Sequence, residues 1–320
     1  MSGFVQAFVD NERALAGARG KRFVVRKATR MQPAKQVERA YTAYLLQLVL
    51  GIKNDIDEIL LPDVDRIVRE ATGRTDGVRH DVEDIEATLR RATGDITARF
   101  NARHLRELEA KIEQYRAATS THNMLQLRRQ LRRMISLDAM PPGGTAERVL
   151  MESFLTANVK LISSLSGDYV SQVEDIVRRG VQAGDRAVVL KGQILGRWSV
   201  TQSRARLIAR DQISKLQGAL TRVRQTSLGL EKYIWRTSRD ERVRETHLVK
   251  EGRVFSWDDP PSDTGHPGQD YQCRCTAEPY IEGYPPPQED RQAVIEEVRA
   301  QRERLAAQMA GRRRNRRRRG

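Results

Sequence analysis

The spacing of apolar residues in this chain changes near Lys232. Before that residue, long stretches place apolar residues three and four apart, which is typical of helices with one buried face. After it, alternating residues, tight turns and prolines are typical of short strands. The sequence therefore predicts an α+β protein that is predominantly helical, with long N-terminal helices followed by a C-terminal domain of helices and a small antiparallel sheet.

Shifts in composition divide the chain further. The first residues are basic and lack a helical period, so we expect an arm rather than a core element: either a frayed terminus or an arm that orders on a partner. Pro141 and Gly143 mark the clearest linker between two domains. The predicted parts are a basic N-terminal arm at 1–34, a helical domain at 35–138, a second domain at 145–284, an amphipathic helix at 288–310 and an arginine-rich tail at 311–320.

Prolines and glycines set the expected helix ends. Pro62 is expected to end the helix that begins near residue 33, because proline lacks an N–H donor and clashes with the preceding turn. Residues 93–95 are a candidate interruption of the next helix. Gly196 is expected to close a short helix at 186–195, and a separate helix is expected at 201–220.

The stretch from Lys232 to Ile281 is expected to form the sheet. Alternation at 233–237 predicts a first strand, and a second is expected to follow Gly252. A third strand is expected at 271–281, where it would carry both cysteines. Residues 242–250 are expected to form a helical turn or loop.

Basic charge is concentrated at the end of the chain. The formal net charge is +15, and the last ten residues hold seven arginines and no acid. Such a run repels itself into an extended chain and binds polyanions through counterion release, without reading sequence. A solubilising tail is the alternative. The candidate nucleic-acid-binding residues are Arg312, Arg313, Arg314, Arg316, Arg317, Arg318 and Arg319.

The two cysteines indicate a reducing environment. They are separated by one residue, so a bridge between them would close a small, strained ring, and reduced thiols are expected. The N-terminus lacks the apolar run of a secretory signal, and no window reaches 18 apolar residues. We therefore expect a soluble protein made in the cytoplasm, with no membrane partner.

Two histidines and the two cysteines have the donor types of a tetrahedral zinc site: His247, His266, Cys273 and Cys275. A Cys-x-Cys pair on a straight strand points to opposite faces, so both thiolates could bind one ion only if the chain bends at Arg274. The alternative is that the cysteines are small buried hydrophobes and the histidines cap loops. Zinc is therefore one of two interpretations, and no other cofactor is expected.

An enzyme is not expected. A Cys–His nucleophile would need a base and an oxyanion hole in fixed geometry, and the sequence shows neither a phosphate-binding glycine loop nor a supported pair of carboxylates. Asp240 precedes Arg242 and Arg244 closely, which favours local ion pairing. The alternative is that these arginines face a partner.

The order of motifs in the second domain resembles the tailed-phage head morphogenesis family, the minor head proteins of the Mu F type. The resemblance covers about residues 145–284. The residues that carry it are, in order, Ile208–Gln212, Trp235–Thr237, Asp240–Arg244, His247, Gly252, Phe255, Gly265–Gly268, Cys273–Thr276 and Pro279. His247, His266, Cys273 and Cys275 match the family motif, and Arg242, Arg244 and Arg274 accompany them.

The resemblance implies a structural role. Proteins of this kind are present in few copies, bind the portal vertex during head assembly and end inside the capsid near the packaged DNA. The expected partners are the portal protein, the major capsid or scaffolding protein, and double-stranded DNA bound without sequence preference. The expected location is the inside of the virion head, with the host cytoplasm during assembly.

Two other functions are weighed against this one. A zinc-dependent enzyme or effector delivered with the genome would use the histidines and cysteines for chemistry. A cytoplasmic protein that binds nucleic acid without sequence preference would use only the basic tail.

Overall fold

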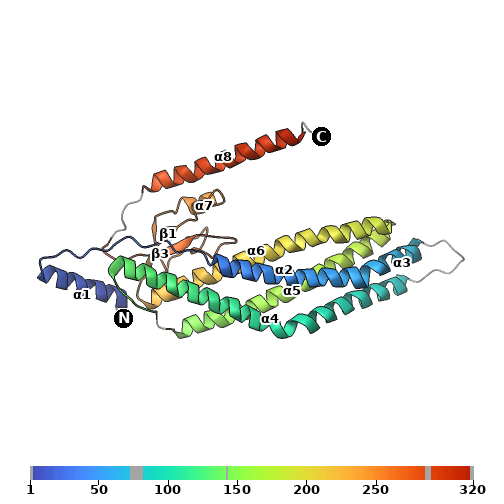
Figure 1. The fold of residues 1–320 in the computed structure, drawn as a ribbon, viewed down its shortest axis with the longest axis horizontal. Helices are drawn as coiled ribbons and strands as arrows, with labels where there is room; N and C mark the ends of the chain where they lie inside the picture. Colours follow the sequence, from blue (N-terminus) through green and yellow to red (C-terminus); the bar gives the residue numbers. More distant parts are fainter. Residues whose placement is uncertain (1–2, 73–81, 142, 285–289, 318–320) are drawn as a thin grey trace. The chain divides into compact units, whose positions relative to one another are not determined.

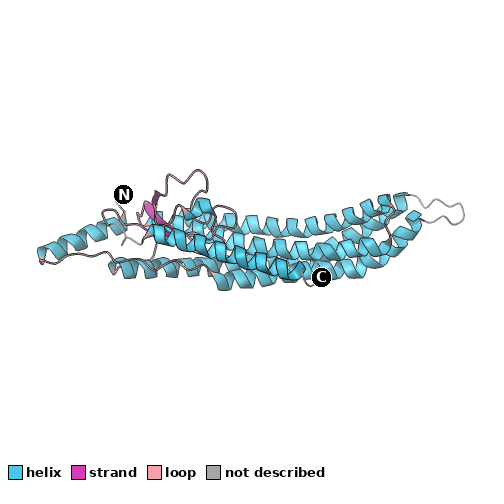
Figure 2. Cartoon of the chain, turned by 90° about the horizontal axis from the view of Figure 1, so that it is seen from above, coloured by secondary structure: helices cyan, strands magenta, loops and turns pink. Residues whose placement is uncertain are grey.

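A computed structural model describes residues 3–72, 82–141, 143–284 and 290–317 (Figure 1), with the backbone only at 82–84, 105 and 312–317. The elements are α1 (Phe4–Ala18), α2 (Lys35–Asp55), a π-helical turn η1 (Ile56–Leu60), α3 (Leu61–Thr72), α4 (Val82–Ile135), α5 (Thr145–Ala183), α6 (Ala187–Ser227), β1 (Lys232–Arg236), α7 (Glu245–Leu248), β2 (Val254–Ser256), β3 (Thr276–Pro279) and α8 (Arg291–Arg317). The predicted fold class is confirmed: long helices precede a small antiparallel sheet (Figure 1), and helices make up most of the chain (Figure 2). Among the described helices, none is both long and apolar enough to cross a membrane.

Packing divides the chain into two units, each drawn from several segments. Unit 1 is Met1–Ala34, Ala118–Met151 and Ile213–Gly320, and unit 2 is Lys35–Ala117 and Glu152–Gln212. The predicted linker is a break between α4 and α5, and it lies inside unit 1.

Unit 2 is a set of helices that run side by side (Figure 1, Figure 2). Apolar residues of α2 such as Tyr41 and Leu45 are fully buried, as the helical period predicts. The Tyr41 hydroxyl donates a hydrogen bond of 2.9 Å to Asn158 Oδ1 on α5. Arg103 on α4 donates to both carboxylate oxygens of the buried Asp55, at 2.9 and 3.0 Å. These bonds pair the polar groups that the apolar core encloses.

Pro62 does not end the helix, contrary to expectation. The chain continues from α2 through η1 into α3, and Pro62 is the second residue of α3. In the π-helical turn the N–H of Leu61 reaches the carbonyl of Ile56, five residues earlier. This wider turn accommodates a proline that lacks an N–H of its own.

Two other expected breaks are also absent. Helix α4 is continuous through residues 93–95, where the Thr93 hydroxyl donates to the Leu89 carbonyl at 3.0 Å. Helix α6 is continuous through Gly196, so the two helices expected at 186–195 and 201–220 are one. One glycine costs a helix only about 1 kcal/mol, which packing over a long helix readily offsets.

The N-terminal segment is not an irregular arm. It contains α1, whose Val5 and Val9 are buried in a core cluster with Leu127 and Leu131 of α4. The extended residues that follow are held by hydrogen bonds, including one of 2.9 Å from the Arg26 N–H to the Met134 carbonyl. The sequence did not predict this helix, because a short helix with two buried positions gives only a weak periodic pattern of apolar residues in a segment with net basic charge.

The C-terminal helix also differs from the prediction at both ends of its range. Ile295 and Val298 pack on Val243 and Leu248, whereas Leu305 is 40% exposed, so only the first turns are anchored. The backbone of Gly311–Arg317 continues α8, contrary to the extended tail expected from charge repulsion. Each like-charge pair one turn apart costs only a few tenths of a kcal/mol, and arginine is a good helix former.

A buried ion pair crosses the sheet, and it provides a stability test. Arg236 Nε donates to Glu278 Oε2 at 2.6 Å, with side chains 5% and 3% exposed. Arg236→Met leaves the carboxylate buried without its main partner, so we expect a loss of about 3–5 kcal/mol in the free energy of unfolding. Urea unfolding followed by tryptophan fluorescence measures it, since Trp235 and Trp257 are buried beside this sheet.

The double variant Arg236→Met with Glu278→Leu should recover much of that loss, because the carboxylate that lost its main partner is also removed. Lys232→Met is the matched control on the same strand. Lys232 pairs with Glu282 at 3.0 Å with both side chains exposed, so the control should leave the urea midpoint almost unchanged. An Arg236→Met variant as stable as the control would contradict the prediction.

Candidate metal centre

The central strand β1 organises the site. The sheet order is β2-β1-β3, with both neighbours antiparallel to β1. Tyr233 and Trp235 are fully buried, and they form a cluster with Trp257, Cys273, Cys275 and Ala277. A central strand with both faces covered explains why four of its five residues are buried.

Helix α6 and the loop before β3 approach each other very closely. A Cβ atom on Gly218 of α6 would lie 2.5 Å from the Pro267 carbonyl oxygen, so only glycine fits there. Gln225, in the last turn of α6, donates to the Ala277 carbonyl at 3.2 Å and accepts from Trp257 Nε1 at 3.2 Å. The helix therefore fixes both the sheet and the loop that carries the cysteines.

Both cysteines lie in this loop and not on a strand, because β3 begins at Thr276. The predicted third strand at 271–281 was therefore too long. Gln272 has a φ of 56°, a left-handed conformation that bends the chain immediately before Cys273. On a straight strand the two thiols would point to opposite faces and could not bind one ion. This objection to a zinc site does not apply, because the cysteines lie in a bent loop.

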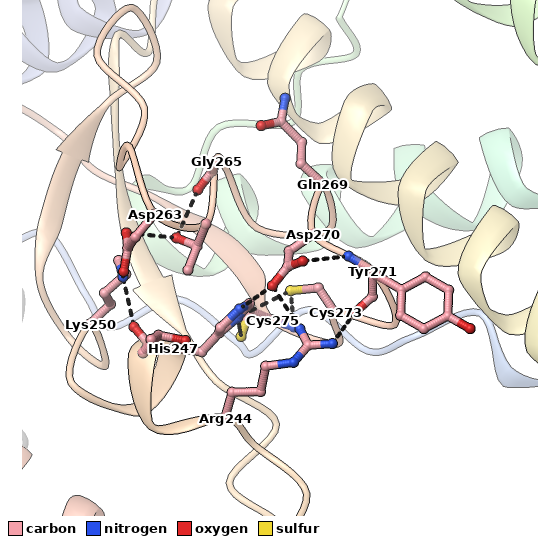
Figure 3. Close-up of polar contacts among 12 residues, drawn as sticks. Arg244, His247, Lys250, Asp263, Gly265, Gln269, Asp270, Tyr271, Cys273 and Cys275 are labelled. Atoms are coloured by element: carbon pink, nitrogen blue, oxygen red, sulfur yellow. Dashed lines mark hydrogen bonds and ion pairs between the residues drawn. The ribbon is translucent and has the colours of Figure 1, made fainter.

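His247 on α7 joins the two thiols (Figure 3). Its Nδ1 atom lies 3.4 Å from Cys275 Sγ and 3.5 Å from Cys273 Sγ. One donor atom from each of the three residues lies within 4.8 Å of the others. The three side chains are 2–8% exposed. We call His247, Cys273 and Cys275 the Cys–His cluster.

Asp270 supports the Cys–His cluster from the other side of the imidazole. His247 Nε2 lies 2.9 Å from Asp270 Oδ2 (Figure 3). Arg244 Nη1 donates to the same carboxylate at 2.7 Å, and its Nη2 donates to the Tyr271 carbonyl. Asp270 therefore orients the histidine ring while Arg244 holds Asp270.

Hydrogen bonds within the Cys–His cluster separate the pKa values of the thiols. The hydrogen bond from Cys275 lowers the pKa of Cys273 to about 5, against the effect of burial and with help from His247 and the Gly268 N–H. The same bond and burial raise the pKa of Cys275 well above its usual value. Burial lowers the pKa of His247, but its bonds with Cys273 and Asp270 outweigh burial and raise it. The opposite shifts make Cys273 the more acidic of the two thiols.

His266 lies outside the Cys–His cluster, so the structure brings together three of the four predicted ligands. Its Nδ1 atom lies 3.0 Å from the Tyr233 hydroxyl, and its ring packs edge-on against Trp257 with centroids 5.0 Å apart. Burial lowers the pKa of His266, which favours the neutral ring. Its place is in the aromatic core of the sheet.

The arginines near the site pair differently from the sequence prediction. Asp240 forms two hydrogen bonds with Arg274, one of them 2.6 Å long, instead of pairing with the side chains of Arg242 and Arg244. The Arg242 side chain is 68% exposed, and its backbone N–H donates to Asp240 at 3.0 Å. These bonds tie the turn after β1 to the loop that bears the cysteines.

Sequence reasoning missed Asp270 and Glu251. Asp270 is 23 residues from His247, and only a search for a carboxylate partner of each histidine would have found it. Glu251 is 1% exposed and accepts bonds from the Thr237 N–H at 2.6 Å and from Arg239 at 2.8 Å. A buried glutamate in a loop has no distinctive sequence pattern.

The predicted nucleic-acid-binding arginines lie at the C-terminal end of the residues that the structure describes. The backbone at Arg312, Arg313, Arg314, Arg316 and Arg317 is helical, and their side chains are not described. Arg318 and Arg319 lie outside the described residues.

Comparison with known proteins finds a family that this part of the chain resembles. The geometry defines a helical domain whose small antiparallel sheet encloses a Cys–His cluster. Residues 171–278 match the family described as Phage Mu protein F like protein, and that range contains His247, His266, Cys273 and Cys275. Over residues 171–278 the chain is similar to the Mu F-like proteins, which confirms the resemblance.

A related protein extends the comparison. An uncharacterised protein of Haemophilus influenzae is 43% identical over 129 residues, which are 40% of this chain and 29% of that protein. The match thus spans less than a third of the relative's length. No solved structure matches the chain.

The coupling of the two thiols predicts a titration shift. In metal-free protein, Cys275→Ala removes the thiol that donates to Cys273, so the pKa of Cys273 should rise from about 5 toward its ordinary value. Thiolate absorbance against pH, measured after treatment with a chelator, tests this, and Cys273→Ala identifies the signal. A Cys273 thiolate that titrates at the same pH in both proteins would contradict the assignment.

Proposed function

We propose that this chain is a minor head protein of a tailed phage, which acts in head morphogenesis at the portal vertex. The observation that carries the proposal is the match of residues 171–278 to the Mu F-like family. In this proposal the protein enters the head during assembly in the host cytoplasm and stays inside the virion. The major capsid or scaffolding protein is a further candidate partner.

The burial of the Cys–His cluster supports a structural role and not an enzymatic one. Cys273 and Cys275 are 3% and 8% exposed, so a substrate cannot reach either sulfur without opening the fold. A catalytic thiolate needs access to its substrate as well as a low pKa. In this proposal the Cys–His cluster stabilises the domain.

The first half of α6 supports contact with a protein partner. Val188 is 73% exposed and Leu195 is 48% exposed. They are seven residues apart, so they lie on the same face of the helix. Val189 and Val200 are also exposed, at 44% and 48%. Grouped exposed apolar side chains mark interaction sites, and we assign this face to the portal protein.

The portal contact can be tested by co-purification. The chain, expressed together with the portal protein of the same phage, should elute with portal on a sizing column. Val188→Asp combined with Leu195→Asp should weaken that association at least about tenfold, because a buried Val or Leu contributes about 1.5–3 kcal/mol. Val24→Asp is the matched control, since Val24 is 62% exposed in a different segment.

A chain that stays free of portal would sink the docking part of the proposal. Equal loss of binding in the Val24→Asp control would move the contact away from α6. Folding of each variant is checked by its far-ultraviolet circular dichroism.

The arginine tail supports contact with packaged DNA. Seven arginines within ten residues give a dense positive charge that can pair with the phosphates of a DNA backbone. Contacts to phosphates need no base recognition. Deleting residues 311–320 should remove most binding to duplex DNA of any sequence. The slope of log K against log salt should become shallower by up to about six, from roughly 0.9 per phosphate contact.

The matched control replaces the seven arginines with lysines. It keeps the charge, so it should keep most of the affinity and the salt slope, whereas replacement by glutamines should behave like the deletion. Unchanged binding after deletion would show that DNA contacts another surface. Binding to DNA without any association with portal would favour a cytoplasmic nucleic-acid-binding protein.

A further inference from the structure

We propose that the Cys–His cluster is a zinc site whose protein ligands are Cys273 Sγ, Cys275 Sγ and His247 Nδ1. The distances carry the proposal. A tetrahedral zinc ion with Zn–S near 2.3 Å and Zn–N near 2.0–2.1 Å places each sulfur about 3.5 Å from the nitrogen. The observed separations are 3.4 Å and 3.5 Å. The third pair, between the two sulfurs, falls within the 4.8 Å limit of the group.

The histidine is held in the orientation that a ligand needs. A metal-bound histidine usually donates its other ring N–H to a carboxylate, which fixes the tautomer and strengthens the ligand. Here Nε2 of His247 lies 2.9 Å from Asp270 Oδ2, which leaves Nδ1 facing the sulfurs. Arg244 in turn fixes Asp270 at 2.7 Å.

Backbone groups are placed to stabilise a bound thiolate. The N–H groups of Gly268 and Cys275 both donate to Cys273 Sγ, each at 3.4 Å. Gly268 has a φ of 91°, and a Cβ atom on it would lie 3.0 Å from the Ser214 carbonyl oxygen and 3.2 Å from Gly218 Cα, so a side chain would fit poorly there. The loop therefore presents its N–H groups to the sulfur of Cys273. When a metal binds, any thiol that is still protonated releases its proton to solvent.

The donor set selects the class of metal. Two thiolates and one imidazole suit zinc, whereas magnesium and calcium require oxygen ligands. Among the described residues no fourth donor joins this group, so the proposal assigns the fourth tetrahedral position to a water molecule. His266 does not take this position, because it lies outside the group and bonds to the Tyr233 hydroxyl.

A metal here would join two separate parts of the small domain. His247 comes from α7, and both cysteines come from the loop before β3. Since the three strands have only five, three and four residues, an added cross-link would stabilise them considerably. The site does not depend on a role in head assembly: a chain that binds no portal would still hold the ion.

Elemental analysis of the full chain, purified under reducing conditions without chelator, tests the site. We expect about one zinc per chain. Replacement by cobalt(II) should give the visible absorption of a tetrahedral ion and sulfur-to-cobalt charge-transfer bands. Cys273→Ser, Cys275→Ser and His247→Asn should each lose the ion, and Asp270→Asn should bind it about 10–100-fold more weakly.

His266→Asn is the matched control and should keep its zinc. Three results would overturn the proposal. The first is a folded wild-type chain that takes up neither zinc nor cobalt, and the second is a mass that shows a Cys273–Cys275 disulfide in protein purified under reducing conditions. The third is a loss of zinc in His266→Asn as large as in the ligand variants. If the cysteine variants do not fold, the cobalt spectrum and chelator competition on the wild-type chain still decide the question.

Discussion

The burial of β1 between its two neighbours is the constraint on which the C-terminal domain depends. Three strands this short cannot hold their shape through backbone hydrogen bonds alone. Their polar groups are therefore bonded inside the core, where Arg236 meets Glu278 and Glu251 meets Thr237. If one partner is removed, the other is left without a hydrogen bond in a medium of low dielectric, which costs free energy. These bonds therefore favour one arrangement of the chain.

That arrangement gives the Cys–His cluster its geometry. Gly218 lets the loop reach α6, Gln225 bonds to β3 and to Trp257, and the loop turns at Gln272. The thiols meet His247 because each of these elements is already fixed by other contacts. A pre-positioned donor set of this kind is what a structural metal ion needs, since the protein and not the ion bears the cost of ordering the ligands.

The proposed role divides the work of assembly among separate parts of the chain. The sheet that holds the Cys–His cluster lies within the range matched to the Mu F-like family, and the first half of α6, in the same range, offers exposed apolar side chains. The arginine tail adds a contact that depends on charge and not on shape. Helix α8 links the tail to the domain, because Ile295 and Val298 pack against Val243 and Leu248.

The sequence by itself determined the fold class, the position of the sheet and the resemblance to the Mu F-like family, because hydrophobic period, turn residues and motif order are local properties that can be read along the chain. It could not show that α4 and α6 are continuous. A single residue with low helix propensity, such as Gly196, does not end a helix when packing stabilises the residues on both sides of it. Only the tertiary structure excluded His266 from the Cys–His cluster and brought in Asp270. Which donors share a site depends on how the loops cross in space, and no spacing along the chain encodes that.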